Sequence, residues 1–461
     1  MVRTTIATVC LFLTSLAARL PAASAAEPHD DRCVILISVD GLAGFYLDDP
    51  KAELPTIRRL ARDGARAAGM VASFPTVTWP NHTTLVTGVP PARHGVLGNN
   101  YLDRASAAPV ALIPDPLFDK DQIVKAPTIY DAAHRAGLTT AAIVWPATRS
   151  ARSLDWTVPD MAGDEAWPKY ATPAWLAELR EAGLPVDRHG AWTKETSGGV
   201  QRDWLYSRMA AHVLKNHSPN LLLIHLVEVD HVQHRHGPRS PEAYWAVSFA
   251  DDRVRDIVEA AGQSPHRDKT TIIVASDHGF FPIEKDIRPN VLLKQEGLLS
   301  DDTKRALCVS QGGAAMVYVL DAKERQEVAD RLRKKFAAVE GIDAVLGPDE
   351  FAKVGQATFA ADSRAPDLWL SAKSGYSFSD ARTGDETVVP REARAGTHGY
   401  LPDQPDMLAT LVLSGYGIKP GSKLEKVRNL DVAPTIARLL GVDLPKVEGR
   451  VLEEALQKTG R

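Results

Sequence analysis

The sequence predicts an α/β protein built on one large, mostly parallel sheet with helices on both faces. Apolar runs of strand length alternate with segments of helical periodicity from residue 33 to residue 275. This alternation is typical of parallel strands joined by helical crossovers. The runs are almost continuously apolar, as expected of strands covered on both faces. With 461 residues, 44% of them hydrophobic, the chain is long enough to bury a large core.

The repeating strand-helix unit begins at Cys33. Pro55 suits the first turn of the first helix, in which Ile57, Leu60 and Ala61 fall at helical spacing. The predicted strands cover residues 33–39, 139–145, 220–229 and 270–275. The predicted helices cover residues 55–68, 130–136, 202–216 and 241–261.

Two stretches interrupt this alternation. Residues 150–204 form an irregular insertion, whose aromatic rings either shape a substrate pocket or pack a small core of the insertion itself. It holds five of the nine tryptophans, Trp156, Trp167, Trp175, Trp192 and Trp204. Residues 286–387 form a small α/β subdomain with strands at 314–320 and 368–372 and a charged amphipathic helix at 322–339. We expect one catalytic domain over residues 26–461 that contains both.

The first 25 residues have the layout of a secretory signal peptide. Arg3 precedes an apolar run from Ile6 to Leu16, and Ala23-Ser-Ala25 forms an A-x-A cleavage site. The run is shorter than the roughly 20 residues of a spanning helix. Cys10 follows Val9 rather than the small residue of a lipoprotein site. We therefore expect a periplasmic or secreted protein with no membrane span.

Charge and cysteine content exclude two classes of protein. The chain has 54 basic and 58 acidic side chains and a formal net charge of −4. Stable nucleic-acid binding needs many clustered Lys/Arg contacts, and no basic run supplies them. Beyond the signal peptide only Cys33 and Cys308 remain, so disulfides are not the main source of stability. We expect Cys33 to be a free buried thiol, with a single Cys33–Cys308 bridge as the alternative.

Carboxylates and imidazoles recur where predicted strands end. Asp40, Asp230 and Asp277 each closely follow an apolar run, so they should emerge at the carboxyl edge of the sheet, where such folds bind ligands. In Asp230-x-x-x-His234 both side chains fall on one side of a helical turn. Three carboxylates and three imidazoles are enough to hold two divalent cations, and zinc accepts this mixture of oxygen and nitrogen. The six residues are Asp40, Asp230, His234, Asp277, His278 and His398.

Thr78 supplies a hydroxyl at the start of a short predicted helix that ends at Gly88. A helix N-terminus favours a phosphate and eases formation of an alkoxide. The alternatives are that Thr78 is only a helix N-cap, or that Thr76 is the reactive residue. Because a metal ion lowers the pKa of a hydroxyl, the combination with the candidate ligands favours Thr78 as a nucleophile.

These residues resemble the nucleotide pyrophosphatase/phosphodiesterase family of the alkaline phosphatase superfamily. The most specific motif is Phe74-Pro-Thr-x-Thr78-x-Pro-Asn-His82, followed by Thr87-Gly88 and His94-Gly-Val-Leu-Gly-Asn99. The resemblance extends from Val34 to about Pro445. It implies an alkaline-phosphatase-like fold, Thr78 as the nucleophile and Asn99 as a ligand of the phosphoryl oxygen. The segment from Leu430 to Leu440 is similar to the closing helix of the superfamily.

The same resemblance implies two Zn²⁺ ions as cofactors, with Mn²⁺ or another divalent ion as the alternative. One cation would be held by Asp40, Thr78, Asp277 and His278. The other would be held by Asp230, His234 and His398. Since imidazoles must be neutral and carboxylates ionised to bind metal, we expect activity to fall below about pH 6.

Three positions depart from the family pattern. Gln233 precedes the ligand His234, where the family usually has glycine. His225 stands where nucleotide-cleaving members often have a tyrosine that stacks on the base, and Trp79 stands where phenylalanine is common. By this resemblance Trp79, His225 and Asn99 are the candidate substrate-binding residues.

The resulting functional prediction is a secreted two-metal phosphodiesterase or nucleotide pyrophosphatase that acts through a phosphothreonine intermediate. Its substrate would be a small phosphodiester, nucleotide or related phosphorylated molecule. The dipeptide Trp145-Pro146 resembles the sequence of diesterases at this place. The alternative, a phosphomonoesterase, would need a cationic side chain here for the extra phosphate charge, and Arg149 or Arg152 could supply it. Gln233-His234 resembles the pair in phosphonate hydrolases. A non-catalytic secreted binding protein is the alternative from another class.

Overall fold

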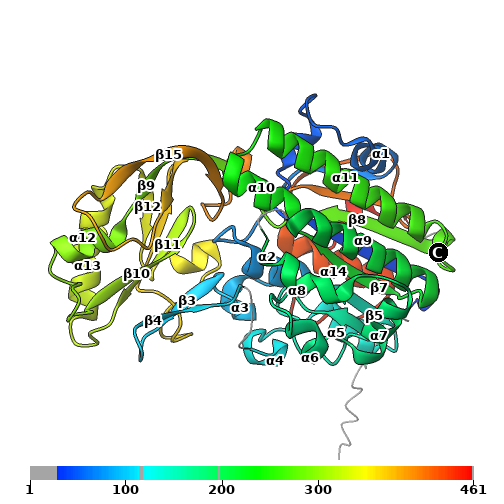
Figure 1. Ribbon diagram of the computed structural model, residues 1–461, viewed down its shortest axis with the longest axis horizontal. Helices are drawn as coiled ribbons and strands as arrows, with labels where there is room; N and C mark the ends of the chain where they lie inside the picture. Colours follow the sequence, from blue (N-terminus) through cyan, green and yellow to red (C-terminus); the bar gives the residue numbers. More distant parts are fainter. Residues whose placement is uncertain (1–28, 114–117, 196–197, 459–461) are drawn as a thin grey trace, which may run out of the picture.

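An eight-stranded sheet forms the centre of the larger lobe in the computed structural model, which describes residues 29–113, 118–195 and 198–458 (Figure 1). The strand order is β17-β2-β16-β8-β1-β7-β5-β6. All of these strands run in one direction except β16, which is antiparallel to both neighbours. The strands are β1 (Cys33–Val39), β2 (Ala65–Val71), β5 (Thr140–Ile143), β6 (Trp156–Val158), β7 (Leu221–Leu226), β8 (Thr270–Ala275), β16 (Leu411–Gly415) and β17 (Ser422–Arg428). The predicted α/β fold with a mostly parallel sheet is confirmed.

Helices cover both faces of this sheet (Figure 1). Ile35 and Ile37 of β1 pack with the helices on one face, and Val34 and Leu36 pack with those on the other. All seven residues of β1 are buried, which explains its unbroken apolar sequence. The first face carries α1 (Pro55–Asp63), α9 (Gly198–Asn216) and α11 (Pro241–Ala261), and the second carries α2 (Thr78–Thr87), α5 (Ile129–Arg135) and α14 (Val432–Leu440).

The first predicted helix is too long. It was expected to run to residue 68, but α1 ends at Asp63 and the chain enters β2 at Ala65. At Gly64 the backbone of β16 comes so close that a Cβ would lie 2.1 Å from the carbonyl oxygen of Leu413. Any larger residue would separate α1 from the sheet, so the turn needs glycine at this position.

The insertion at 150–204 contributes to the main core. It adds β6 to the edge of the large sheet and carries α6 (Ala166–Tyr170), α7 (Pro173–Glu181) and α8 (His189–Trp192). Trp167 and Trp175 are buried in the same hydrophobic cluster as β1. The two rings therefore serve packing, and the core they pack belongs to the whole lobe rather than to the insertion alone.

A smaller lobe lies beside the first (Figure 1). Its antiparallel sheet has the order β10-β11-β13-β12 and packs against α12 (Pro289–Gln295) and α13 (Arg325–Ala337). A three-stranded sheet of order β14-β9-β15 accompanies it. The strands are β9 (Phe281–Ile287), β10 (Ala306–Gln311), β11 (Ala314–Val319), β12 (Ile342–Leu346), β13 (Leu368–Ala372), β14 (Gly375–Phe378) and β15 (Val388–Thr397). Because β9 and β15 pair, the chain returns to the larger lobe near the point where it left.

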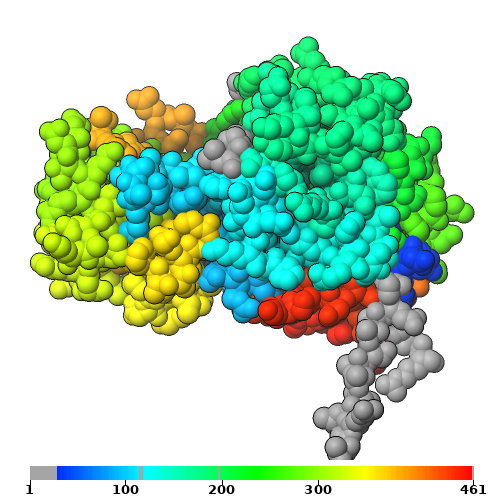
Figure 2. Space-filling model, turned by 90° about the horizontal axis from the view of Figure 1, so that it is seen from below, coloured from blue at the N-terminus to red at the C-terminus, as the bar shows by residue number. Residues whose placement is uncertain are grey.

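A hairpin of β3 (Asn100–Asp103) and β4 (Ala108–Ala111) links the two lobes. The guanidinium of Arg104 donates to the carbonyl oxygens of Val319 and Ala365 at 2.8 and 2.9 Å. Figure 2 shows this segment, in cyan, against the smaller lobe. The backbone N–H of Asn99 donates to Oε1 of Gln311 at 2.9 Å. The smaller lobe therefore fixes the position of the segment that carries Asn99.

The two described cysteines are both free and buried, which confirms the prediction for Cys33. Burial raises the pKa of the Cys33 thiol to about 12. The predicted signal peptide at 1–25 lies outside the described residues. Within the described part of the chain, no helix combines the length and the apolar character needed to span a bilayer.

Acid should destabilise the fold through buried neutral histidines such as His94. Its Nδ1 accepts from the N–H of Val96 and its Nε2 pairs with Oγ1 of Thr84, and burial lowers its pKa from 6.5 to about 3. The unfolded chain binds this proton below pH 6.5 and the folded chain does not, so stability is lost as the pH falls from 6.5 toward 3. Each such histidine removes about 1.4 kcal/mol per pH unit.

A denaturant series at pH 7, 6, 5 and 4.5 on wild type and His94→Gln measures this effect. The excess stability of the wild type over the variant should shrink as the pH falls, because the variant has no imidazole to protonate. A pH-independent difference between the two proteins would contradict the assignment.

Candidate metal centre and active site

The three carboxylates predicted from strand ends meet at one edge of the sheet. β8, β1 and β7 are adjacent and parallel, with Ser38 of β1 paired to Ala275 of β8 and to His225 of β7. Asp40 and Asp277 follow β1 and β8 at nearly the same level. Asp230 lies in the first turn of α10 (Glu228–His236), which begins just after β7. This shared carboxyl edge is where ligands bind in such folds.

The first group of ligand atoms comes from α10 and from the chain after β15. His234 lies one helical turn after Asp230, and its Nε2 is 3.4 Å from Oδ1 of Asp230. Nε2 of His398 is also 3.4 Å from that oxygen and 3.1 Å from Nε2 of His234. One carboxylate oxygen and two ring nitrogens therefore converge on a single point.

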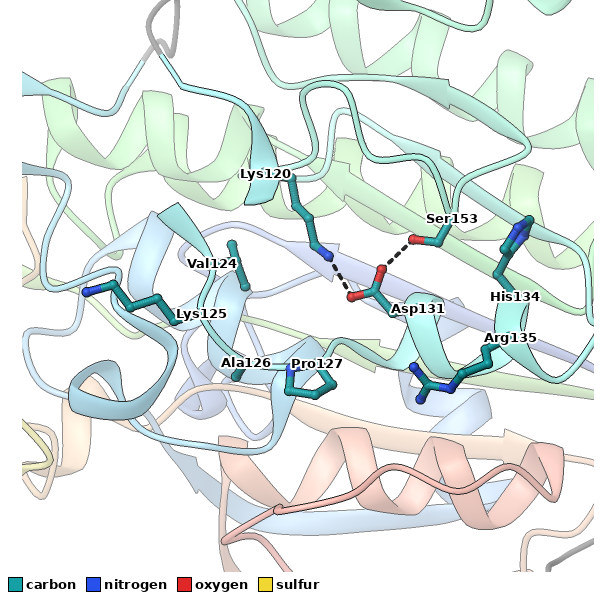
Figure 3. Close-up of a pocket in the computed structure, with 9 residues that line it drawn as sticks. All are labelled: Lys120, Val124, Lys125, Ala126, Pro127, Asp131, His134, Arg135 and Ser153. Carbon is teal, nitrogen blue, oxygen red and sulfur yellow. Dashed lines mark hydrogen bonds and ion pairs between the residues drawn. The ribbon is translucent and has the colours of Figure 1, made fainter. Parts of the chain in front are cut away.

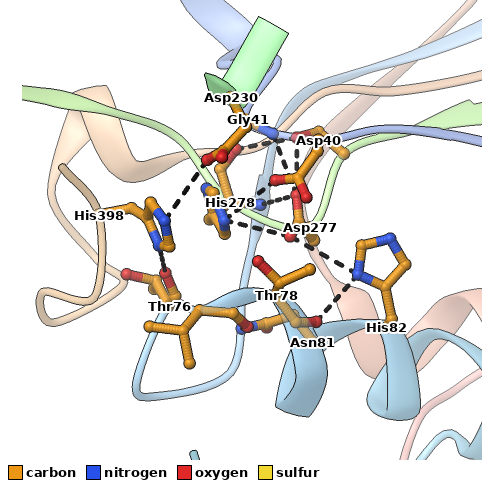
Figure 4. Close-up of polar contacts among 12 residues, drawn as sticks. Asp40, Gly41, Thr76, Thr78, Asn81, His82, Asp230, Asp277, His278 and His398 are labelled. Carbon is orange, nitrogen blue, oxygen red and sulfur yellow. Dashed lines mark hydrogen bonds and ion pairs between the residues drawn. The ribbon is translucent and has the colours of Figure 1, made fainter. Parts of the chain in front are cut away.

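The second group lies directly beside the first (Figure 4). Nε2 of His278 is 3.3 Å from Oδ1 of Asp40 and 3.1 Å from Oδ2 of Asp277. The ring of His278 stacks on that of His398 with centroids 3.6 Å apart. Ligand atoms of Asp40, Asp230 and His278 also lie within 4.8 Å of one another, so Asp230 is within reach of both groups. The structure thus brings together all six predicted Asp and His ligands.

Backbone carbonyls orient the three imidazoles. Nδ1 of His278 is 3.1 Å from the oxygen of Gly279, Nδ1 of His234 is 3.1 Å from the oxygen of Gly396, and Nδ1 of His398 is 2.8 Å from the oxygen of Thr76. Since a carbonyl can only accept, each Nδ1 carries a proton, and each ring is turned so that its Nε2 faces the centre. Histidines that bind metal are typically held in this way.

Several atoms that face the centre are buried without a hydrogen-bond partner in the described part of the chain. They are Oδ1 of Asp40, Oδ1 of Asp230, Oδ2 of Asp277 and Nε2 of His278. Buried polar atoms normally have partners, so each such atom needs an explanation. Burial, followed by the charges of Asp277 and Asp230, raises the pKa of Asp40 well above its ordinary value. Divalent cations would supply both the missing partners and the missing positive charge, so these residues fit a metal centre.

Thr78 is the first residue of α2 and faces this centre. Figure 4 shows its hydroxyl oxygen directed toward Asp277 and His278. The N-cap of α2 is Val77, and no side chain caps the helix, so Thr78 is not an N-cap. The hydroxyl of Thr76, the alternative candidate, already has two hydrogen-bond partners. It donates to the carbonyl oxygen of Tyr400 at 3.0 Å and accepts from the N–H of Gly399 at 2.9 Å. Of the two threonines, Thr78 is the one whose hydroxyl faces the centre.

Asn99 is held beside the start of α2. Its Oδ1 accepts from the backbone N–H of Trp79 at 2.9 Å. With Oδ1 engaged, the amide Nδ2 is the group of Asn99 that remains for an anionic ligand. This geometry suits the phosphoryl-binding role that the resemblance implies for Asn99.

The ring of Trp79 does not lie on an open surface. It is 1% exposed and packs in a cluster with Val96, Leu112, Ile123 and Val124. Val124 in turn lines a surface pocket of about 440 Å³ that Lys120, Asp131 and Ser153 also line (Figure 3). Trp79 was predicted to bind substrate, and in the structure its ring is used in packing.

His225 is also placed differently from our expectation. It is 2% exposed on β7, and its Nε2 donates to Oδ2 of Asp40 at 2.8 Å. His225 was predicted to bind substrate, and in the structure its ring lies in the core behind a candidate metal ligand. Its position suits a residue that orients Asp40 and leaves Oδ1 of that carboxylate for a cation.

Replacing His225 with phenylalanine tests the positioning role. We expect metal affinity and kcat/KM to fall by about 10- to 100-fold, as is typical when the partner of a ligand is lost. His225→Gln keeps an N–H donor and should recover part of the loss. Measuring zinc affinity with a competing chelator distinguishes the roles: a substrate-contacting residue would change KM and leave zinc affinity intact.

Two residues near the centre had no role in the sequence prediction. Gln233 accepts from the hydroxyl of Tyr46 and donates to the carbonyl oxygen of Gly41, both at 2.9 Å, so it holds α10 against the loop after Asp40. Nδ1 of His82 is 2.9 Å from the oxygen of Thr78, one helical turn earlier. Gln233 was noticed in the sequence as a departure from glycine and as part of a pair that resembles phosphonate hydrolases, but not as a residue that positions α10. For His82, the available signal in the sequence was its position four residues after Thr78, one helical turn away.

A family-model match over most of the chain identifies a hydrolase of the alkaline phosphatase superfamily. Residues 34–401 match the model of the type I phosphodiesterase / nucleotide pyrophosphatase family. The chain belongs to this family, whose members hydrolyse phosphoric ester and anhydride bonds and depend on metal ions.

Known relatives agree with this assignment. The chain is 24% identical over 423 residues to an uncharacterised pyrophosphatase/phosphodiesterase of Schizosaccharomyces pombe, an alignment that covers 89% of this chain and 77% of the relative. Human ectonucleotide pyrophosphatase/phosphodiesterase family member 7 is 23% identical over 414 residues, with 89% and 80% covered. The match to rat family member 3 is 27% identical but covers 55% of this chain and 25% of that protein. The chain therefore spans about a quarter of that last relative.

Solved structures share the fold. Murine ectonucleotide pyrophosphatase/phosphodiesterase 5 superposes with a TM-score of 0.71 at 19% identity, over 92% of this chain and 100% of that one. An inactive threonine-to-alanine variant of the same murine protein, in complex with AMP, superposes equally well at 18% identity.

Proposed function

We propose that the protein is an exported two-metal phosphodiesterase or nucleotide pyrophosphatase that acts through a phosphothreonine intermediate. The observation that carries this proposal is the convergence of six Asp and His side chains, with unpartnered buried atoms, beside the hydroxyl of Thr78. Asp40, Thr78, Asp277 and His278 would hold one cation, and Asp230, His234 and His398 the other. Three imidazoles with carboxylates favour Zn²⁺, and Mn²⁺ is the alternative.

Thr78 would attack the phosphorus atom and expel an alcohol or a phosphate. Water would then hydrolyse the phosphothreonine and release the second product. Bound cations would lower the pKa of the attacking hydroxyl and neutralise the charge on the phosphoryl oxygens. Asn99 Nδ2 would donate to those oxygens. The murine neighbour described as inactive with threonine changed to alanine agrees with a threonine nucleophile.

We propose a diester or an anhydride, such as a nucleotide, rather than a monoester as the substrate. A monoester carries one more negative charge, and Arg149 was the buried cation available to meet it. Its Nε donates to Oδ1 of Asp119 at 2.8 Å, and the side chain is 7% exposed. Because Asp119 already neutralises this guanidinium, Arg149 is not free for a phosphate. The AMP complex of the murine neighbour agrees with a nucleotide ligand.

Turnover of bis-p-nitrophenyl phosphate and of p-nitrophenyl phosphate, with and without a chelator, tests the proposal. We expect the diester to be cleaved with the higher kcat/KM, activity to be lost on chelation and zinc to restore it. Higher kcat/KM on the monoester would favour a phosphatase. Metal-loaded protein that cleaves neither compound would support a binding protein.

Export is the remaining part of the proposal, and it rests on residues 1–25. Relatives named as ectonucleotide enzymes and venom phosphodiesterases agree with it. Mass spectrometry of the protein recovered from the periplasm or the medium should give an N-terminus near residue 26. An intact N-terminus on cytoplasmic protein would contradict it.

A further inference from the structure

A second group of metal-binding side chains lies away from the active site. Nε2 of His212 is 2.6 Å from Oε1 of Glu178, and Nε2 of His217 is 2.8 Å from Oε2 of the same carboxylate. Ligand atoms of all three residues lie within 4.8 Å of one another. Glu178 belongs to α7, His212 belongs to α9, and His217 follows the end of α9. The group therefore joins the insertion to a core helix.

We propose that Glu178, His212 and His217 form a peripheral zinc site with an open fourth position. Two imidazoles and one carboxylate are a known protein ligand set for zinc. Tetrahedral coordination with bonds of about 2.0 to 2.1 Å places neighbouring ligand atoms about 3.3 Å apart. The present nitrogen–oxygen distances of 2.6 to 3.0 Å need only a small expansion to reach that value.

The site is partly built before any ion binds. The ring of His217 is stacked on Trp156, with centroids 4.6 Å apart and an interplanar angle of 27°. Glu178, His212 and His217 retain side-chain exposures of 34%, 16% and 24%. A cation can thus enter from solvent, while the helix and the indole ring restrict the two imidazoles. Such restriction lowers the entropic cost of binding.

Binding requires a change of hydrogen-bonding partners. At present Nε2–H of each ring donates to Glu178. On binding, each ring would carry its proton on Nδ1, and the Nε2 lone pair would face the ion in place of the hydrogen bond.

Zinc at this site would tie the insertion to the helix that supports α10. Asp203 of α9 accepts from the N–H groups of Val227 and Glu228 at 2.8 and 3.0 Å, and α10 carries Asp230 and His234. At Gly199 the two helices are so close that a Cβ would lie 1.7 Å from Oε2 of Glu228. His212 is nine residues beyond Asp203, or about 13 Å along the axis of α9. The peripheral site is therefore separate from the proposed catalytic centre but connected to it through one rigid helix.

The test compares the zinc content of wild type with that of His212→Gln/His217→Gln, after both are loaded with zinc and dialysed. Glutamine retains an N–H donor for Glu178 but is a poor zinc ligand. We expect the variant to hold one equivalent less zinc per chain and to keep its hydrolase activity. Retained activity shows that the variant has folded. His134→Gln, which removes an exposed histidine 3.7 Å from Asp155, serves as the control and should lose no zinc.

A second measurement uses Co²⁺, whose visible absorption reports tetrahedral coordination. The intensity lost between wild type and the double variant should correspond to one four-coordinate ion. Equal zinc content and equal Co²⁺ spectra in the two proteins would overturn the proposal and leave the three residues as a hydrogen-bonded cluster. Because activity is read separately, failure of the peripheral site and failure of the catalytic proposal give different results.

Discussion

Thr78→Ala should reduce kcat/KM for bis-p-nitrophenyl phosphate by at least about 10³-fold, as expected when a covalent nucleophile is removed. The hydroxyl of Thr78 is directed toward Asp277 and His278. Alanine removes the attacking oxygen and leaves the six Asp and His ligands in place, so most of the bound zinc should remain. Steady-state kinetics and metal analysis of the same preparation measure both effects.

Two further variants distinguish Thr78 from its neighbour. Thr78→Ser keeps a hydroxyl and should retain activity within about tenfold of wild type. Thr76→Val removes the hydrogen bonds to Tyr400 and Gly399 and should lower stability with little effect on chemistry. Full activity in Thr78→Ala, together with its loss in Thr76→Val, would make Thr76 the nucleophile.

Asp277→Asn should lower activity by about 10²- to 10³-fold, a loss comparable to that of one strong electrostatic contact in a transition state. Oδ1 of Asp277 accepts from the N–H groups of Gly41 and His278, both at 3.1 Å, and asparagine can keep these bonds. Oδ2 is the unpartnered atom, and in asparagine an amide N–H₂ would replace it. The variant should therefore fold normally but bind less zinc, as measured by metal analysis and restored activity at high zinc concentration.

Asp251→Asn is the matched control for this experiment. Asp251 is also a buried carboxylate, 1% exposed, and it accepts from the N–H groups of Thr56 and Ile57 at the start of α1. Its replacement should lower the melting temperature and leave zinc content unchanged. If both variants lost the same amount of zinc, the effect would come from general destabilisation, and Asp277 would not be a ligand.

The parallel part of the fold could be predicted because strands that are buried on both faces have almost continuously apolar sequences. β1 and β8 begin and end where their apolar runs do. β2 was missed because its sequence, Ala65-Arg-Ala-Ala-Gly-Met-Val71, continues the small and charged composition of α1. β17 alternates exposed charges and also lacks a long apolar run. Such strands are stabilised by distant partners, which a local pattern does not contain.

The candidate ligands were predictable for a similar reason. Residues that follow adjacent parallel strands must meet at one edge, and this placed Asp40, Asp230 and Asp277 together before their contacts were known. The surroundings of the Trp79 and His225 side chains could not be predicted in this way, because they depend on residues distant in the sequence. Ile123 of α4 (Lys120–Ile123) packs with the ring of Trp79, and the carbonyl oxygen of Val144, just after β5, lies 3.3 Å from Nδ1 of His225. No local signal in the sequence identifies these neighbours.

The central place of β16 has a consequence for how the chain is made. β16 lies between β8 and β2, yet its residues, 411–415, are synthesised after nearly nine-tenths of the protein. Until they leave the ribosome, one side of β8 has no partner and β2 is not connected to β1, β7 and β8. His398 also arrives late. The nascent chain therefore cannot complete either its sheet or its candidate metal centre until late in synthesis, and this delay agrees with the proposed export of the chain.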